Sequence, residues 1–407
     1  MNNNELNELT KKYLMETNDN VIGVSYGYKI VSGMVTNEKT ISFRVKEKKT
    51  IEQLTTDEII PKEIKHMGVV YSTDVNQGEV KFLCDAAFYQ WETIPPTNRN
   101  KIRPLKGGVS TTNYTSMSGS IGTLGFLAID NEDGSIVGVS NDHVYIDDPF
   151  IATERTLPSP VTNIRDDITI QPYEVNYGTN DLTDNIGIVK RYNPFRSPSA
   201  WNTVDGSLTT INSAVLSNTE SWKQEGLTLA APLIFASTLE IDNLLSTDPL
   251  LYSAGRTTGA KGEGTTKLKT FSLSGSFTIA YHRQGIVQKI NFNDCIEFVA
   301  SAATNPGFIC LYPIYAGDSG SALIADFGGT KKIIGLCFAG DDYHGIACRI
   351  DNVANELDIS AWDGTTPNFS DTASTEQYVI SGLDNNVAIS IGGKIYWQVG
   401  LTNDLPS

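Results

Sequence analysis

The sequence lacks the long apolar runs that place a chain in a membrane. No stretch approaches the roughly 20 consecutive apolar residues that a spanning helix needs. Residues 1–10 are rich in Asn and Glu and carry neither a basic start nor an apolar stretch. We therefore expect no membrane span and no signal peptide, and a location either in the cytoplasm or in a phage particle.

Positive charge is also scarce. Lys and Arg number 31 against 47 Asp and Glu, which gives a formal net charge of −16. A chain this acidic repels phosphate groups, so neither nucleic-acid binding nor attachment to an anionic membrane surface is expected.

Cysteine is rare, and the number is odd. The five residues lie mostly in apolar, strand-like runs, at Cys84, Cys295, Cys310, Cys337 and Cys348. This pattern favours buried free thiols in a reducing compartment over a disulfide framework.

Glycine is abundant, with 35 residues against 16 Pro, and hydrophobic residues make up 40% of the chain. This composition indicates a packed core and many turns between short strands, so we expect a mainly β protein. Helical spacing of apolar residues predicts short helices over residues 5–15, 51–65 and 350–357.

Composition shifts divide the chain into four parts. Residues 1–85 read as a small α+β module and 86–117 as a linker, and short β runs without helical interruption then continue from 118 to 363. Such runs favour a barrel or sandwich. Residues 364–407 read as a second linker followed by a C-terminal β segment with strands between 378 and 399.

The strongest local motif is Gly317-Asp318-Ser319-Gly320-Ser321. A serine between glycines in a tight turn can present its hydroxyl outward. The backbone N–H groups of Gly317 and Ser319 can then converge on a developing oxyanion. Considered alone, the motif fits an ordinary Gly-Ser turn between strands equally well.

A second motif places a histidine after an apolar strand, in Ser140-Asn141-Asp142-His143-Val144. A serine hydroxyl needs a base to remove its proton, and histidine titrates near neutrality. The chain has only four histidines. His143 is the one that follows a buried strand in the part of the chain that carries Ser319.

Together these motifs resemble the chymotrypsin-fold, trypsin-like serine peptidases. More narrowly, the chain resembles the bacterial group related to the plant narrow-leaf proteins. The resemblance covers about residues 18–360 and rests on the motifs at 21–24, 59–64, 122–125, 140–144, 255–259 and 317–321. It implies two antiparallel β-barrels with the site between them, and the catalytic order His, Asp, Ser along the chain.

The resemblance implies Asp205 as the acid that orients His143, because Asn202-Thr203-Val204-Asp205 matches the family's pattern. Asp184, which precedes another expected strand, is the alternative. The catalytic residues are then His143, Asp205 and Ser319.

The family also binds the substrate backbone on the strand that follows the serine turn, which here ends in Phe338-Ala339-Gly340. Pro313 stands where trypsin-like enzymes place a pocket carboxylate, so a preference for Lys or Arg is not expected, and a small or apolar preference is. No activation cleavage site is apparent. Asp318 therefore needs another partner, either backbone N–H groups or a cation such as Arg256.

Three further patterns fit common structural features better than they fit ligand sites. The glycine-rich stretch 255–264 lacks the Gly-Lys-Ser/Thr of a phosphate-binding loop. Cys337, His344 and Cys348 lack an apparent fourth zinc ligand. The acidic residues around 166–167 and 181–184 do not have the spacing of a calcium loop. We expect no cofactor and no metal.

The C-terminal segment lies outside the peptidase resemblance and is similar to the start of small fibronectin-like β modules. Such modules recur in bacterial surface and phage proteins. The sequence therefore supports two hypotheses. The first is a serine endopeptidase acting on peptide or protein substrates. The second is an assembly protein, for example of a phage particle, that uses a protease fold. It would form a homo-oligomer or a larger assembly through its N-terminal module or through the unpaired sheet edge of its C-terminal β segment.

Overall fold

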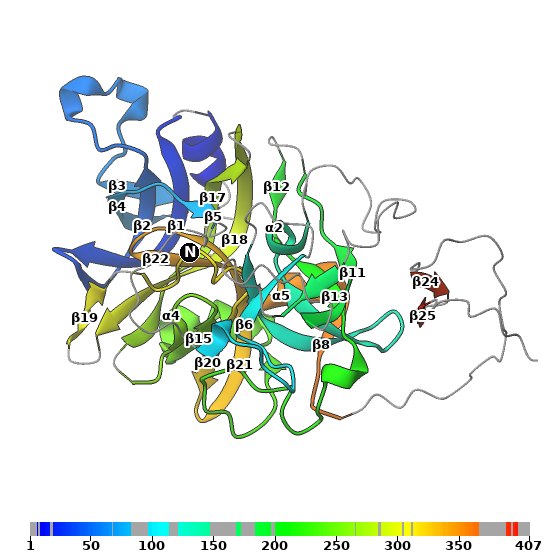
Figure 1. Cartoon of the computed structure of the whole chain (residues 1–407). Coiled ribbons are helices and arrows are strands. Elements are labelled where there is room, and N and C mark those ends of the chain that lie inside the picture. Colours follow the sequence, from blue (N-terminus) through cyan, green and yellow to red (C-terminus); the bar gives the residue numbers. More distant parts are fainter. Residues whose placement is uncertain are drawn as a thin grey trace, which may run out of the picture.

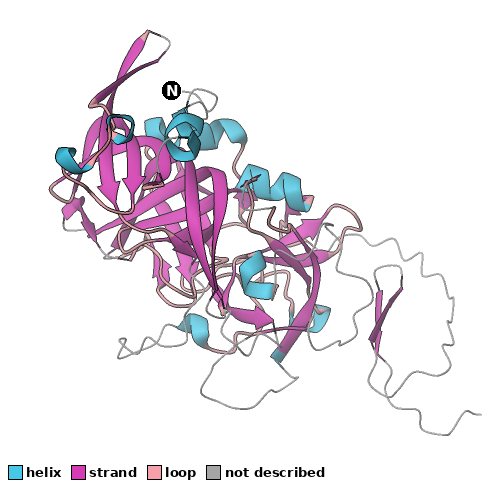
Figure 2. Cartoon of the chain, turned by 90° about the horizontal axis from the view of Figure 1, so that it is seen from above, coloured by secondary structure: helices cyan, strands magenta, loops and turns pink. Residues whose placement is uncertain are grey.

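The computed structural model describes most of the chain. The described residues are 6, 9–16, 19–66, 68–82, 97–113, 121–146, 168–171, 184–196, 200–264, 266–283, 286–302, 305–310, 312–365, 388–391 and 394–397. They are mainly β, as the composition predicted, and the helices are few and short (Figure 2). Among them, no helix is long and apolar enough to cross a membrane. The three boundaries between the four predicted parts of the chain remain predictions.

Six antiparallel strands close a first barrel. In ring order they are β7 (Gly122–Leu124) running on into β8 (Phe126–Asp130), then β9 (Ile136–Ser140), β13 (Ser207–Thr210), β11 (Asn185–Tyr192), β10 (Ile168–Ile170) and β6 (Val109–Asn113). The ring closes because β7 and β8 form one bent strand. β7 pairs with β6, whereas β8 pairs with β9. β23 (Ile359–Ala361) adds to the other edge of β8.

A second barrel also has six antiparallel strands. In ring order they are β17 (Thr266–Arg283), β15 (Leu251–Gly255), β20 (Ala322–Phe327), β21 (Thr330–Gly340), β22 (His344–Arg349) and β18 (Ile286–Ala302). The long hairpin between β17 and β18 closes the ring. The two barrels lie side by side in Figure 1.

The N-terminal strands continue the sheet of the second barrel. The strands are β1 (Val21–Val31), β2 (Met34–Val45), β3 (Glu63–His66), β4 (Val69–Gln77) and β5 (Lys81–Phe82). β1 pairs with β17, and β2 pairs with β19 (Asn305–Cys310). Figure 1 shows these blue strands beside the yellow-green β17 and β18.

The helix predicted at the N-terminus is present, with Leu6, Leu9 and Tyr13 buried on β1 and β2 around the helical turn η1 (Lys11–Glu16). The helix predicted over residues 51–65 is wrong. Two short turns, η2 (Ile51–Gln53) and η3 (Thr56–Glu58), precede β3 instead. Each turn has a capping box on its own threonine, Thr50 and Thr55, so the segment begins two turns rather than one helix.

The closing helix α5 (Ile350–Leu357) is present as predicted. The remaining elements are η5 (Thr97–Arg99), α2 (Asp142–Tyr145), β12 (Trp201–Asn202), η8 (Ser213–Val215), β14 (Ile234–Phe235), α3 (Thr238–Asp242), α4 (Leu244–Thr247), β16 (Gly259–Lys261), β24 (Ala388–Ile391) and β25 (Lys394–Trp397). β24 and β25 form a hairpin within the predicted C-terminal β segment.

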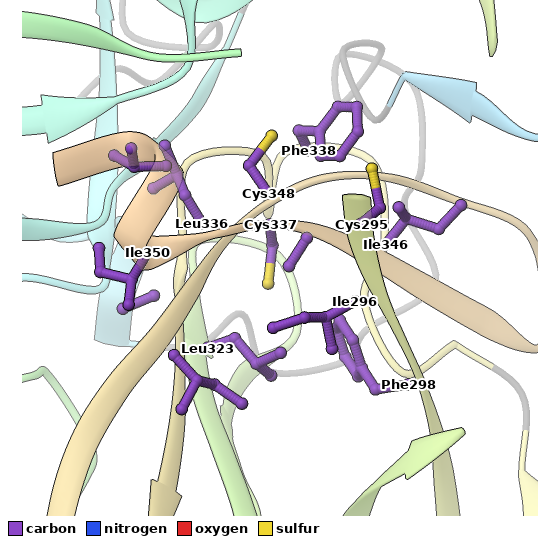
Figure 3. Close-up of a cluster of buried hydrophobic side chains, with 14 of the residues drawn as sticks. Cys295, Ile296, Phe298, Leu323, Leu336, Cys337, Phe338, Ile346, Cys348 and Ile350 are labelled. Atoms are coloured by element: carbon purple, nitrogen blue, oxygen red, sulfur yellow. The ribbon is translucent and has the colours of Figure 1, made fainter. Parts of the chain in front are cut away.

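One large apolar core fills the second barrel and reaches the first. Figure 3 shows part of it, where side chains from β18, β20, β21 and β22 meet α5. Cys295, Cys337 and Cys348 lie in this core as free thiols, in line with the prediction. Burial raises the pKa of Cys337 to about 12, so this thiol stays protonated. Cys84 and the side chain of Cys310 lie outside what the structure describes.

Candidate active site

His143 and Asp205 meet at one end of the first barrel. His143 lies on the short helix α2, directly after β9, and Asp205 lies directly before β13, the strand that pairs with β9. The Nδ1 atom of His143 is 2.5 Å from Oδ2 of Asp205. Both side chains are fully buried. Asp184, the alternative acid, pairs instead with Lys101 at 2.6 Å.

The surroundings of Asp205 fix its carboxylate. Its Oδ1 atom accepts the backbone N–H of Asp142 at 2.7 Å, and the N–H of His143 lies at 3.4 Å. The backbone N–H of Asp205 points to the sulfur of Cys348 at 3.4 Å, and its carbonyl accepts the side-chain amide of Asn141 at 2.7 Å. The loop before β13 is therefore held from both barrels.

The pairing with Asp205 decides which nitrogen of His143 can act as a base. A carboxylate is acceptor-only, so the proton of the neutral ring lies on Nδ1 and leaves Nε2 with a free lone pair. Nε2 is buried and has no hydrogen-bond partner among the described residues. This is the protonation state that a general base needs.

Ser319 lies in the turn before β20 of the second barrel. Its hydroxyl donates to the carbonyl of Phe338 at 3.3 Å. The backbone N–H groups of Asp318 and Gly320 are used within the fold, by Tyr315 and Cys337 respectively. Those of Gly317 and Ser319 donate no backbone hydrogen bond within the described part of the chain. Two such N–H groups in a glycine-bent turn are what an oxyanion hole requires.

Close contacts require a glycine at position 320 in the turn and at position 122 on the neighbouring strand β7. Gly320 has φ of 90°, and a Cβ there would lie 2.1 Å from the carbonyl oxygen of Thr123. A Cβ on Gly122 would lie 2.4 Å from the side chain of Val144 and 2.8 Å from the carbonyl of Ser319. Gly122 thus brings the residue after His143 and the backbone of Ser319 to the same point.

Asp318 is held by backbone N–H groups rather than by a cation. Its Oδ1 atom accepts from Thr257 at 2.7 Å and from Thr258 at 3.0 Å, and its Oδ2 atom accepts from Tyr315 at 2.9 Å. Of the two kinds of partner that the sequence allowed, the backbone groups are the ones present. Arg256 donates to Ser110 at 3.1 Å instead. The motif at 255–259 therefore holds the turn that carries Ser319.

The residues predicted to bind the substrate backbone are at the end of β21, but they already have a partner. Ala339 lies opposite Phe82, and Gly340 lies opposite Lys81, in an antiparallel pair with β5. Phe338 packs its ring on Phe292 with centroids 4.7 Å apart. Pro313 is buried five residues before Asp318, and its part in a specificity pocket remains a prediction.

Two residues near the site were missed by sequence reasoning. Phe82 lies in the N-terminal part of the chain, yet its ring contacts His143 with centroids 5.0 Å apart. Asp142, the neighbour of His143, is a fully buried carboxylate. Burial and the charge of Asp205 raise the pKa of Asp142 well above its usual range. Nothing in the local sequence around Phe82 signals its position, whereas an acidic residue directly before His143 could have been noted.

Residues of the weaker sequence patterns have protein partners in the structure. The Nδ1 atom of His344 lies 3.0 Å from Asp341. Burial and the charge of Arg44 lower the pKa of His344 to about 3, although Glu297 acts in the opposite direction. Of the acidic residues around 166–167 and 181–184, only Asp184 is described; Asp166, Asp167 and Asp181 lie outside the described residues.

No family model matches the sequence, and no curated protein matches it. Among solved structures, the chain is similar to Nocardiopsis protease (TM-score 0.36, 13% identity), to Thermobifida fusca protease A (0.35, 12%) and to Cellulomonas bogoriensis chymotrypsin (0.35, 14%). These similarities cover 63–64% of this chain and 98% of each of the others.

Proposed function

We propose that this chain is a serine endopeptidase that cleaves peptide or protein substrates through an acyl-enzyme. The observation that carries the proposal is the buried His143–Asp205 pair, whose protonation state leaves Nε2 of His143 as a free base. The position of Ser319 in the second barrel also supports the proposal. Ser319 lies in a glycine-containing turn, where the N–H groups of Gly317 and Ser319 donate no backbone hydrogen bond to the described residues.

Each residue then has one task. Ser319 Oγ attacks the substrate carbonyl carbon while Nε2 of His143 takes the hydroxyl proton, and Asp205 stabilises the resulting imidazolium. The N–H groups of Gly317 and Ser319 bind the oxyanion. The tetrahedral intermediate collapses with loss of the amine, which receives the proton from His143. Water then attacks the acyl-enzyme by the same route and restores Ser319.

The end of β21 supplies the backbone contacts for the substrate. A peptide paired in an antiparallel manner with Phe338, Ala339 and Gly340 would place its carbonyl near Ser319, whose hydroxyl touches the Phe338 carbonyl. The buried apolar residues of this strand agree with a preference for a small or apolar substrate side chain. The assembly role remains a prediction that no contact in the described structure favours.

The test is covalent labelling of the purified chain with a fluorophosphonate, followed by peptide mass spectrometry. Such reagents react with a serine only where a base activates it, so we expect an adduct on Ser319. The matched controls are His143→Ala, which removes the base, and Ser321→Ala, which removes a nearby hydroxyl of the same turn. We expect no adduct with the first and an adduct on Ser319 with the second. An adduct that persists in His143→Ala contradicts the proposal.

A further inference from the structure

The N-terminal part of the chain places a peptide strand on the edge predicted to bind substrate. β5 pairs with β21 in antiparallel register, Phe82 with Ala339 and Lys81 with Gly340. On its other side β5 pairs with β17, and the carbonyl of Val80 accepts the N–H of Ala280 at 3.2 Å. A two-residue strand is thus held between two strands of the second barrel.

The side chain of Phe82 covers the candidate base. Its ring meets the imidazole of His143 edge-on, at 5.0 Å between centroids and 67° between planes. Four more rings surround it and form what we call the aromatic box: Phe195, Tyr281, Phe292 and Phe338, at 5.7, 5.2, 5.9 and 6.0 Å. Phe82 is only 6% exposed, and the catalytic residues are entirely buried.

We infer that residues 80–82 are an internal inhibitor that occupies the place of a substrate strand and keeps the site closed. The inference rests on the proposed peptidase function. A substrate cannot pair with Ala339 and Gly340 while β5 does, because a strand edge has one set of free N–H and C=O groups. Nor can a substrate side chain approach His143 while Phe82 fills the aromatic box.

The rest of the N-terminal part explains how so short a strand stays in place. Arg44 of β2 is buried and pairs with Glu297 of β18 and with Asp341, just beyond β21. Ser272 also donates to Glu297, at 2.7 Å. The two contacts of Arg44 fix β2 to the second barrel, so β5 binds as a tethered segment at high effective concentration. Release then requires only the loss of the β5 contacts themselves.

The contribution of Lys81 is through its backbone. Its side chain is more than half exposed and pairs with Glu79 at 3.1 Å, away from the site. The aromatic ring of Phe82 and the backbone pairing of Lys81 can therefore be removed separately. This separation gives two independent variants, one that empties the aromatic box and one that breaks the strand pairing.

The experiment measures the rate of fluorophosphonate labelling of Ser319 in the full chain. We compare wild type with Phe82→Ala, which empties the box, and with Lys81→Pro, which removes a backbone N–H and fixes φ. Phe271→Ala is the matched control, because it truncates an equally buried ring of the second barrel outside the box. Thermal unfolding of each variant verifies that it is folded.

We expect Phe82→Ala and Lys81→Pro to be labelled at least tenfold faster than wild type, and Phe271→Ala to be labelled like wild type. Equal rates in all folded variants would overturn the inference and leave the peptidase proposal standing. Absence of an adduct on Ser319 in every folded variant would refute the peptidase proposal, and the inhibitor with it.

A peptide added in trans provides an independent readout. The synthetic peptide Asn-Gln-Gly-Glu-Val-Lys-Phe, which copies residues 76–82, should slow the labelling of Lys81→Pro, in which the strand pairing of β5 is broken, back toward the wild-type rate. The same peptide with Ala in place of Phe should have at most a tenth of that potency. Equal potency of the two peptides would contradict the role of the ring in closing the site.

Discussion

At the scale of single residues, the proposed chemistry depends on how Asp205 sets the tautomer of His143. In Asp205→Asn, the Oδ1 atom can still accept the N–H of Asp142, but the amide donates to Nδ1 and moves the ring proton to Nε2. Ser319 then faces a donor instead of a base. We expect the labelling or turnover rate to fall by about 10⁴-fold. The measurement is the rate constant of the folded variant.

Asp205→Glu is the companion variant, because it keeps the charge and shifts its position, so it should retain more of the rate than Asp205→Asn. A rate for Asp205→Asn within tenfold of the wild-type rate would show that the tautomer does not matter. His143 would then not be the base.

Asp142 gives a pH-dependent prediction at the same scale. In the unfolded chain its carboxyl ionises near pH 4, whereas burial and Asp205 raise its folded pKa well above that. The unfolded state therefore binds fewer protons, and stability falls as pH rises above about 4 toward the folded pKa. The asparagine in Asp142→Asn cannot ionise, so the stability of this variant does not decrease with pH for this reason. Relative to wild type, its unfolding free energy should rise by up to about 1.4 kcal/mol per pH unit above pH 4.

The measurement is urea unfolding of both chains between pH 5 and pH 8. The difference between the two unfolding free energies should grow steadily with pH until the folded pKa is passed. A difference that stays constant across this range would show that Asp142 ionises alike in the folded and unfolded chains.

Short motifs mark the turns of His143, Asp205 and Ser319, so these three residues could be proposed from the sequence. Phe82 could not be found in this way. That ring reaches His143 only because β5 pairs with β21, where Phe82 lies opposite Ala339, 257 positions later in the chain. Contacts between segments so distant leave no local pattern, and they follow from the packing of the whole sheet.

At the scale of elements, the turn that carries Ser319 depends on the loop at 255–259. Asp318 accepts three backbone N–H groups, from Thr257, Thr258 and Tyr315. Asp318→Ala leaves all three without this acceptor. We expect a loss of about 2–4 kcal/mol in the unfolding free energy and at least a 100-fold fall in the labelling rate.

Asp326→Ala is the control, since Asp326 accepts the N–H of Gly329 in an exposed turn beyond β20. It should cost less than about 1 kcal/mol and leave labelling unchanged. Comparable effects of the two substitutions would mean that the loop at 255–259 does not position Ser319.

Helices with a clear spacing of apolar residues could be predicted from the sequence. Short helical turns that begin at a capping threonine could not. Ile350–Leu357 buries Ile350, Val353 and Leu357 on one face, as its spacing indicated. Residues 51–58 also have apolar spacing, but Thr50 and Thr55 each begin a separate turn. Each capping box involves residues three positions apart and begins its own turn, so the weak helical spacing of apolar residues does not produce one longer helix.

At the scale of the whole molecule, the N-terminal strands form part of the sheet of the second barrel. The buried ion pair of Arg44 and Glu297 joins the N-terminal strand β2 to β18 of the second barrel. Burial raises the pKa of Glu297, but Arg44 and His344 lower it further, so the net shift is downward and Glu297 stays ionised. In Arg44→Met this carboxylate is left buried without its cation. We expect a loss of about 3–5 kcal/mol in the unfolding free energy.

Lys29→Met is the matched control, because it removes the cation of a more exposed ion pair, between Lys29 on β1 and Glu38 on β2. Its cost should be below about 1 kcal/mol. The double variant Arg44→Met with Glu297→Met should recover part of the loss, since Glu297 is then no longer a buried charge without its cation, whereas Asp341 still lacks Arg44. A loss in Arg44→Met no larger than in Lys29→Met would show that this pair does not hold the N-terminal strands.

The most direct test of the peptidase assignment is cleavage of a mixed peptide library, with new N-termini identified by mass spectrometry. Wild type and Phe82→Ala are each incubated beside the same chain carrying Ser319→Ala. We predict new termini that depend on Ser319 in both backgrounds, with faster formation in Phe82→Ala. Products that persist after Ser319→Ala, or no products from either folded chain, would contradict the assignment of this site as a peptidase.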